Sequence, residues 1–145
     1  MSKENFVQVR DVMSPNVETI DGLSTVADAI EHMQEKRFGA LIVDRRDKSD
    51  EYGLVTVQDI AKDVIEPDRN PNRVSIYEIM EKPVLTVHSD MNIRYAIRLL
   101  ERVGELRALV IDNNEAVGII TMLDMVLRYQ DFYHADEEKG GSEKG

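Results

Sequence analysis

The chain carries one pattern of residues twice, and this duplication constrains its fold more than any other feature. Residues 53–60 read GLVTVQDI, and residues 118–125 read GIITMLDM. Farther upstream, VMSPNVETI at 12–20 matches IMEKPVLTV at 79–87. Because a chain of 145 residues can bury one sizeable core or two small, mutually dependent ones, we expect two similar lobes rather than two independent enzymes.

Each copy contains an amphipathic helix between its matched segments. Apolar residues recur at i, i+3, i+4 and i+7 from Val26 and again from Ile93. This spacing predicts a helix with one buried face in each copy. Residues suited to cap these helices precede them, namely Ser24 or Thr25 and Asp90 or Asn92.

Two buried strands and a second helix follow in each copy. ALIVD at 40–44 matches ALVID at 108–112 with an offset of 68, and GLVT and GIIT provide the next strand. VQDIAKDVI and MLDMVLRYQDFY then predict helices, the first of which ends at Glu66-Pro67. The predicted fold is therefore of the α/β (α+β) class, with two β-α-β-β-α repeats packed with pseudo-twofold symmetry into one module.

The predicted domain organisation follows these boundaries. An N-terminal segment covers 1–8, the first repeat covers 9–65, a proline-containing linker covers 66–75, and the second repeat covers 76–130. The remaining residues, 131–145, carry five acidic and two basic side chains and almost no aliphatic ones. This composition predicts a disordered acidic tail, because such a segment has no apolar surface to bury.

Composition excludes several classes of function. The absence of cysteine removes disulfides, thiolate metal sites and cysteine nucleophiles. A net charge of −10 and an aromatic content of 6% disfavour nucleic acid as a partner. The three histidines are scattered, and no P-loop, GxGxxG, GxSxG or HExxH pattern occurs, so we expect neither catalysis nor a metal site. With no signal peptide and no apolar run of about 20 residues, the expected location is the cytoplasm, without membrane contact.

The repeated Thr-x-x-Asp pairs, Thr56 with Asp59 and Thr121 with Asp124, have two interpretations. At a strand end followed by a helix N-terminus, the aspartate could accept two hydrogen bonds from a ribose diol. The same spacing is also that of a capping box, a structural device that contributes about 1 kcal/mol. The residues alone leave both interpretations open, because duplication copies caps as faithfully as sites.

From about Val9 to about Tyr129 the chain resembles a tandem pair of CBS domains, the unit named after cystathionine β-synthase, which is often called a Bateman module. The resemblance rests on the matched pairs VMSPNVETI and IMEKPVLTV, ALIVD and ALVID, and GLVTVQD and GIITMLD, and on the helices with Ala29-Ile30 and Ala96-Ile97. It implies a regulatory, non-catalytic module that binds an adenosine-containing ligand such as AMP, ADP or ATP in clefts between the repeats, for example as an energy sensor.

The resemblance also assigns residues to two clefts. The first-choice cleft has Thr56 and Asp59 on the ribose, Val84 and Leu85 against the adenine and Arg107 on phosphate, with Leu54 and Gln58 from the same motif. The second cleft has Thr121 and Asp124 on the ribose and Val17 and Glu18 at the base, with Ile119, Arg37 and Gly39. Because Arg107 aligns with Gly39, we expect the first cleft to hold the nucleotide and the second to be weak, empty or differently selective.

Partners and alternatives complete the sequence-based expectations. The nucleotide would act as a regulatory ligand rather than a required cofactor, and the sequence leaves open whether Mg²⁺ accompanies its phosphates. The apolar faces of the two final helices predict a homodimer, which would act on an unidentified downstream protein. One rival function is a ligand-free interaction or scaffold module whose Thr-x-x-Asp pairs are only helix caps. Another is nucleic-acid binding through Arg94, Arg98 and Arg102, for which a solvated helix face is the simpler explanation.

Overall fold

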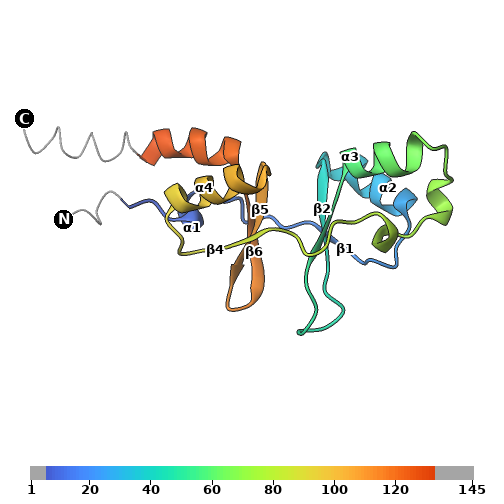
Figure 1. Ribbon diagram of the computed structural model, residues 1–145, viewed down its shortest axis with the longest axis horizontal. Helices are drawn as coiled ribbons and strands as arrows, with labels where there is room; N and C mark the ends of the chain where they lie inside the picture. Colours follow the sequence, from blue (N-terminus) through green and yellow to red (C-terminus); the bar gives the residue numbers. More distant parts are fainter. Residues whose placement is uncertain (1–5, 133–145) are drawn as a thin grey trace, which may run out of the picture. The chain divides into compact units, whose positions relative to one another are not determined.

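The computed structural model describes residues 6–132, and these divide into two compact units (Figure 1). One unit spans Val17–Val84, and the other combines the chain up to Asn16 with the chain from Leu85 onward. We call them the central unit and the outer unit. Each contains one three-stranded sheet with helices, so the predicted mixed α/β class is confirmed.

The central unit holds the first sheet. Its elements are β1 (Thr19–Ile20), α2 (Val26–Lys36), β2 (Ala40–Val43), β3 (Gly53–Thr56), α3 (Val57–Ile60), a π-helix (Ala61–Ile65) and two 3-10 helices (Pro71–Arg73 and Ile76–Glu78). The strand order is β1-β2-β3, with β1 parallel and β3 antiparallel to β2. Thr25 caps α2 through a reciprocal box with Asp28, which selects between the two caps that the sequence allowed.

The outer unit has the same strand arrangement. Its elements are α1 (Val9–Val12), β4 (Thr86–His88), α4 (Ile93–Val103), β5 (Arg107–Asp112), β6 (Glu115–Thr121) and a helix over 122–132. β4 is parallel and β6 antiparallel to β5. Asn92 caps α4, and the short α1 lies beside α4 (Figure 1). The final helix includes the first two residues of the predicted acidic tail, and the rest of that tail lies outside the described residues.

Each unit has its own apolar core. In the central unit, the predicted stripe of α2 packs on β2 and β3 together with residues from the predicted linker and beyond it: Val74, Ile76 and Ile79. In the outer unit, the stripe of α4 packs on β5 and β6 together with α1, through Val9 and Val12. Burial of these faces away from water is the main favourable contribution to each unit.

The spatial units therefore do not follow the sequence repeats. Residues 76–84 begin the second repeat but pack in the central unit, where Leu54 and Glu81 exchange two backbone hydrogen bonds of 2.9 and 2.8 Å. Residues 9–16 begin the first repeat but pack in the outer unit, where Ser14 and Ile119 exchange two of 2.9 Å. The leading segment of each repeat thus pairs with the sheet formed by the other repeat.

This exchange explains the glycine at the start of GLVT and GIIT. A Cβ on Gly53 would lie 2.9 Å from the sulfur of Met80. A Cβ on Gly118 would lie 2.6 Å from the sulfur of Met13 and 2.7 Å from the carbonyl oxygen of Ser14. Both methionines pack against the cores, so at these two glycines the exchanged segments lie too close to the sheets for a side chain.

The sheet registers correct one detail of the repeat alignment. Ala40 lies opposite Thr56, whereas Arg107 lies opposite Thr121. The buried positions agree, because Ala40–Val43 and the first four residues of β5 show the same order of one half-buried and three buried side chains. The structural offset between these strands is therefore 67, and the offset of 68 suggested by ALIVD and ALVID is wrong by one residue, because similar apolar letters on adjacent positions of a buried strand carry little register information.

None of the helices within residues 6–132 is long and apolar enough to cross a membrane.

Candidate ligand-binding site

Each Thr-x-x-Asp pair forms a corner where the last strand of a sheet turns into a helix. Thr56 is the final residue of β3 and the N-cap of α3. Thr121 is the final residue of β6 and precedes the helix over 122–132. The backbone N–H groups of a helix's first turn have no partner within the helix, so both corners offer hydrogen-bond donors next to a carboxylate.

The Asp59 corner forms a complete capping box. The Thr56 N–H and hydroxyl both donate to Asp59 Oδ2, at 2.9 and 3.0 Å, and the Asp59 N–H donates to the Thr56 oxygen at 3.1 Å. Thr56 is buried and Asp59 is half-buried. Within residues 6–132 no donor reaches Asp59 Oδ1. The cap geometry is therefore present, and it leaves one carboxylate oxygen for a further partner.

The Asp124 corner forms only half of a box. The Asp124 N–H donates to the Thr121 hydroxyl oxygen at 2.9 Å. In the described part of the chain, the Asp124 carboxylate accepts no hydrogen bond, and both residues are half-buried. The two corners thus differ: Asp59 Oδ2 is engaged by its own cap, whereas no donor among residues 6–132 reaches either oxygen of Asp124.

Arg107 belongs to the Asp124 corner's own sheet. It lies directly opposite Thr121 on the antiparallel pair β5–β6, so the two side chains are on the same face of the sheet. The predicted counterpart of Arg107 was Gly39, and the register shows that it is Ala40. Gly39 corresponds instead to Leu106, because Gly39 and Leu106 carbonyls accept the N–H groups that follow Thr56 and Thr121, at 3.0 and 2.9 Å. The first corner still lacks a basic residue at this position.

The other residues predicted for the first-choice cleft lie in both units. Leu54 and Val84 are buried in the central unit, and the Val84 N–H donates to the Tyr52 carbonyl at 2.9 Å. Gln58 is exposed on the first turn of α3. Leu85 is half-buried in the outer unit, where its carbonyl accepts the Leu109 N–H at 2.9 Å. The grouping of these residues with Arg107 around one ligand stays a prediction.

The residues predicted for the second cleft are likewise divided between the units. Val17 and Glu18 are half-buried before β1, and Arg37 is an exposed left-handed residue, with φ of 63°, that ends α2 and is followed by the exposed Gly39. Ile119 is half-buried on β6 of the outer unit. This cleft, too, stays a prediction as an assembled site.

The sequence did not indicate one contact of the second predicted cleft, between Glu18 and His32. The His32 Nε2 atom lies 2.9 Å from a carboxylate oxygen of Glu18, with side chains 30% and 26% exposed. The two residues are separated by 14 positions. No short-range spacing could have indicated the pair, because it depends on α2 packing beside the start of β1.

Both units therefore repeat one β-α-β-β-α arrangement with a Thr-x-x-Asp corner at the end of the last strand. The CBS domain model matches residues 9–66 and 76–131, so the chain belongs to the CBS domain family. It is a tandem pair of CBS domains, as the sequence motifs predicted.

Three relatives illustrate the similarity. An uncharacterized protein of Methanopyrus kandleri is 30% identical over 121 residues, which is 83% of this chain and 61% of that protein. A hexameric CBS-CP12 protein from bloom-forming cyanobacteria has a structure with a TM-score of 0.81 and 35% identity, over 96% of this chain and 85% of that one. A CBS domain protein of Pyrobaculum aerophilum, solved in complex with AMP, has a TM-score of 0.72 over 82% of this chain and 90% of its own. At 16% identity, this last likeness shows the fold alone.

Proposed function

We propose that this protein is a regulatory module that binds an adenosine-containing ligand at its Thr-x-x-Asp corners. The proposal rests on the two corners. Each brings together a threonine, the N–H groups of a helix's first turn and an aspartate oxygen that no donor within residues 6–132 reaches. A ribose diol needs an acceptor of this kind, and phosphate groups favour helix N-termini. The AMP complex of the Pyrobaculum aerophilum CBS protein supports this choice of ligand class.

The two corners are proposed to contribute differently. Asp59 would accept a ribose hydroxyl through Oδ1 while Oδ2 continues to cap α3. Asp124 can use both oxygens, and Arg107 on the same face of its sheet can pair with a phosphate through charge-assisted hydrogen bonds. The sequence assigned Arg107 to the Asp59 corner instead. The two assignments are separated by combining Arg107→Met with each aspartate substitution, because effects on ligand binding are non-additive only for residues that act on the same ligand.

The test is a thermal-shift panel with AMP, ADP and ATP, each with and without Mg²⁺. A ligand at 100 times its dissociation constant stabilises the folded state by about 2.7 kcal/mol, which raises the melting temperature by several degrees. We expect Asp59→Ala and Asp124→Ala each to reduce this shift, and Arg107→Met to reduce it for the corner that the arginine serves.

Asp28→Ala is the matched control for loss of a cap. Asp28 forms with Thr25 the same reciprocal box that Asp59 forms with Thr56, but on α2. Its removal should lower the melting temperature of the free protein by the amount expected for a lost cap, about 1 kcal/mol of stability, and leave the AMP-induced shift unchanged. If Asp59→Ala and Asp124→Ala behave like Asp28→Ala, the scaffold function with purely structural caps replaces this proposal.

We also propose that a second copy of the chain covers the helix over 122–132. Three apolar residues at i, i+3 and i+4 on this helix are largely exposed: Leu123 at 65%, Val126 at 59% and Leu127 at 57%. A stripe of this kind favours association. Light scattering at tens of micromolar should give at least twice the 16.6 kDa of one chain, and Leu127→Glu should shift the mass toward one chain. Leu106→Glu, at an equally exposed position outside this helix, should not. A monomeric wild-type protein would exclude this assembly.

A further inference from the structure

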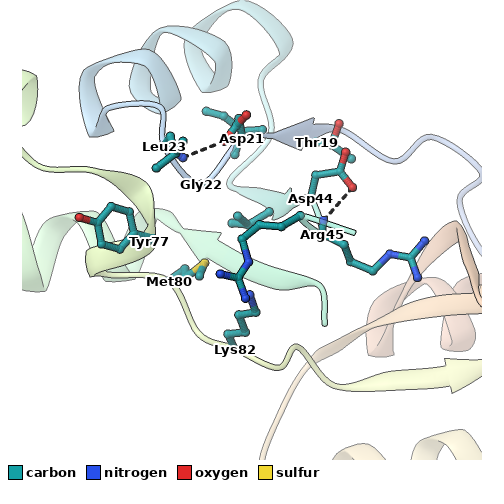
Figure 2. A pocket seen from close by; sticks show the side chains of 12 residues that line it. Thr19, Asp21, Gly22, Leu23, Asp44, Arg45, Tyr77, Met80 and Lys82 are labelled. Carbon is teal, nitrogen blue, oxygen red and sulfur yellow. Dashed lines mark hydrogen bonds between the residues drawn. The ribbon is translucent and has the colours of Figure 1, made fainter. Parts of the chain in front are cut away.

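A cavity of about 820 Å³ opens in the central unit, away from its Thr-x-x-Asp corner (Figure 2). β1 and β2 end at this cavity, and Val43 of β2 pairs there with Gly53, the first residue of β3. Ala40 pairs with Thr56 at the other end of the same two strands. None of the residues predicted for the adenosine clefts lines the cavity, so it is a separate place in the fold.

Two basic side chains of the cavity wall converge on one carboxylate. Lys82 Nζ lies 2.9 Å from Asp50 Oδ1, and Arg46 Nε lies 3.0 Å from Asp50 Oδ2. The Asp50 side chain is 8% exposed, and the guanidinium of Arg46 together with the ammonium of Lys82 holds its pKa well below its ordinary value. Both cations thus donate to one carboxylate of the chain itself, that of Asp50. A third basic residue of the wall, Arg45, lies with its guanidinium 4.5 Å from the centre of the Tyr52 ring.

The rest of the wall offers apolar surface that is open to solvent. Tyr77 is 55% exposed and Leu23 is 78% exposed. Figure 2 shows Tyr77 and Met80 at the left of the cavity, with Lys82 below them, Asp21 above beside Leu23, and Asp44 to the right. Gly22 lies between Val43 and Tyr77, since a Cβ there would be in van der Waals contact with both, at 3.4 Å from Val43 Cγ1 and 3.7 Å from Tyr77 Cβ.

The outer unit provides an internal comparison, because its sheet is built on the same register. At the offset of 67, the counterparts of Gly22, Tyr77 and Lys82 are Ser89, Arg10 and Pro15. The hairpin β5–β6 closes through a two-residue turn, Asn113 and Asn114, both at positive φ, whereas residues 44–52 join β2 to β3 and supply Arg46 and Asp50. The features of the cavity are thus not required to fold the repeat.

We propose that this cavity is a second ligand site, for a small molecule that carries one anionic head, phosphate or carboxylate, on an apolar ring. The head binds Lys82 and Arg46 and competes with Asp50 for them, and the ring packs against Tyr77 and Met80. Asp21 and Asp44 also line the cavity and disfavour polyanions, because like charges repel. The proposal does not depend on the adenosine clefts.

The test is a titration of the whole 145-residue chain followed by amide NMR shifts, with phenyl phosphate, benzoate and neutral benzyl alcohol as probes. We expect saturable shifts at Gly22, Tyr77 and Lys82 with one or both anions, and weaker binding of the alcohol. Because a hydrogen bond between charged groups changes affinity by about tenfold, Lys82→Met should weaken binding by about that factor, and Asp50→Asn should tighten it by a similar one. The anion that binds more tightly identifies the head group.

Lys48→Met is the matched control, since Lys48 is an exposed lysine of the same loop that does not line the cavity. It should leave the affinity unchanged, as should Asp59→Ala, so this site and the adenosine site can fail separately. Equal binding of benzyl alcohol, an unchanged affinity in Asp50→Asn, or no saturable binding of either anion would overturn the proposal. The NMR spectra themselves report whether each variant is folded.

Discussion

The aspartates of the two corners differ in how many hydrogen bonds their carboxylates accept from the threonine of the same pair. Asp59 Oδ2 receives two hydrogen bonds from Thr56, whereas the Asp124 carboxylate receives none from residues 6–132. In both corners the aspartate's own N–H binds the threonine hydroxyl, which a side-chain substitution leaves in place. The side chain of Asp59 therefore contributes more to folding than that of Asp124.

This difference predicts unequal costs of alanine in the free protein. Asp59→Ala should lower the free energy of unfolding by about 1 kcal/mol, the usual cost of a lost cap, whereas Asp124→Ala should lower it by a few tenths, from the lost charge at a helix N-terminus. Urea titrations without ligand measure both values. Equal losses would show that Asp124 also caps its helix in solution.

The two repeated glycines support a second prediction at this scale. Gly118→Ala should destabilise the protein by about 1–3 kcal/mol, because the new methyl group meets the Ser14 carbonyl oxygen, which belongs to the backbone and cannot move alone. Gly53→Ala should cost less, since its closest neighbour is the flexible end of the Met80 side chain. Thermal unfolding of the two variants gives the order, and negligible costs for both variants would contradict the close approach of the exchanged segments to these sheets.

Among the elements, the loop over residues 44–52 is where the repeats diverge most. Arg46, and then Lys82, bind the ionised form of Asp50, so the pKa of Asp50 in the folded protein lies below its ordinary value of 3.8. A carboxyl group with a depressed folded-state pKa contributes stability that is complete above its unfolded pKa and is lost as the pH falls toward the folded one. The Asp50 interactions should therefore stabilise the protein at neutral pH and weaken in acid.

Asp50→Asn tests this dependence on pH. The variant should unfold at a lower urea concentration than the wild type near neutral pH, and the difference should shrink at about pH 2.5. A comparison of the two urea midpoints at each pH cancels the acid effect of the other carboxylates. A difference that stays constant with pH would mean that Asp50 contributes through packing rather than through its charge.

The sequence predicted the helices and strands better than it predicted which distant residues contact each other. Periodicity located α2 and α4 and their buried faces, because the 3.6-residue repeat follows directly from helix geometry. It could not fix which residue of β5 corresponds to which residue of β2 in the other repeat, because a run of buried apolar residues looks alike after a shift of one position. It also could not reveal the Glu18–His32 contact or the cation pair around Asp50, since Lys82 lies 32 positions from Asp50.

For the molecule as a whole, the exchange of leading segments means that a sequence repeat and a folding unit are different stretches of chain. The central unit takes Val74, Ile76 and Ile79 into its core, and all three lie beyond the end of the first repeat at 66. Loss of a single buried Leu or Ile side chain costs about 2–5 kcal/mol, which is a large part of the stability of a small domain.

A fragment of residues 17–84 should therefore fold, whereas a fragment of residues 9–66 should not. The first contains the complete apolar cluster of the central unit, and the second lacks three of its buried residues and carries α1, whose Val9 and Val12 are buried in the outer unit. Circular dichroism during heating should show a cooperative transition for 17–84, at a lower temperature than for the full chain, because a domain of this size buries only about 60% of its surface. The fragment 9–66 should lose its signal gradually. If 9–66 instead unfolds cooperatively and 17–84 does not, each repeat folds with its own leading segment and the exchange is not a property of the protein in solution.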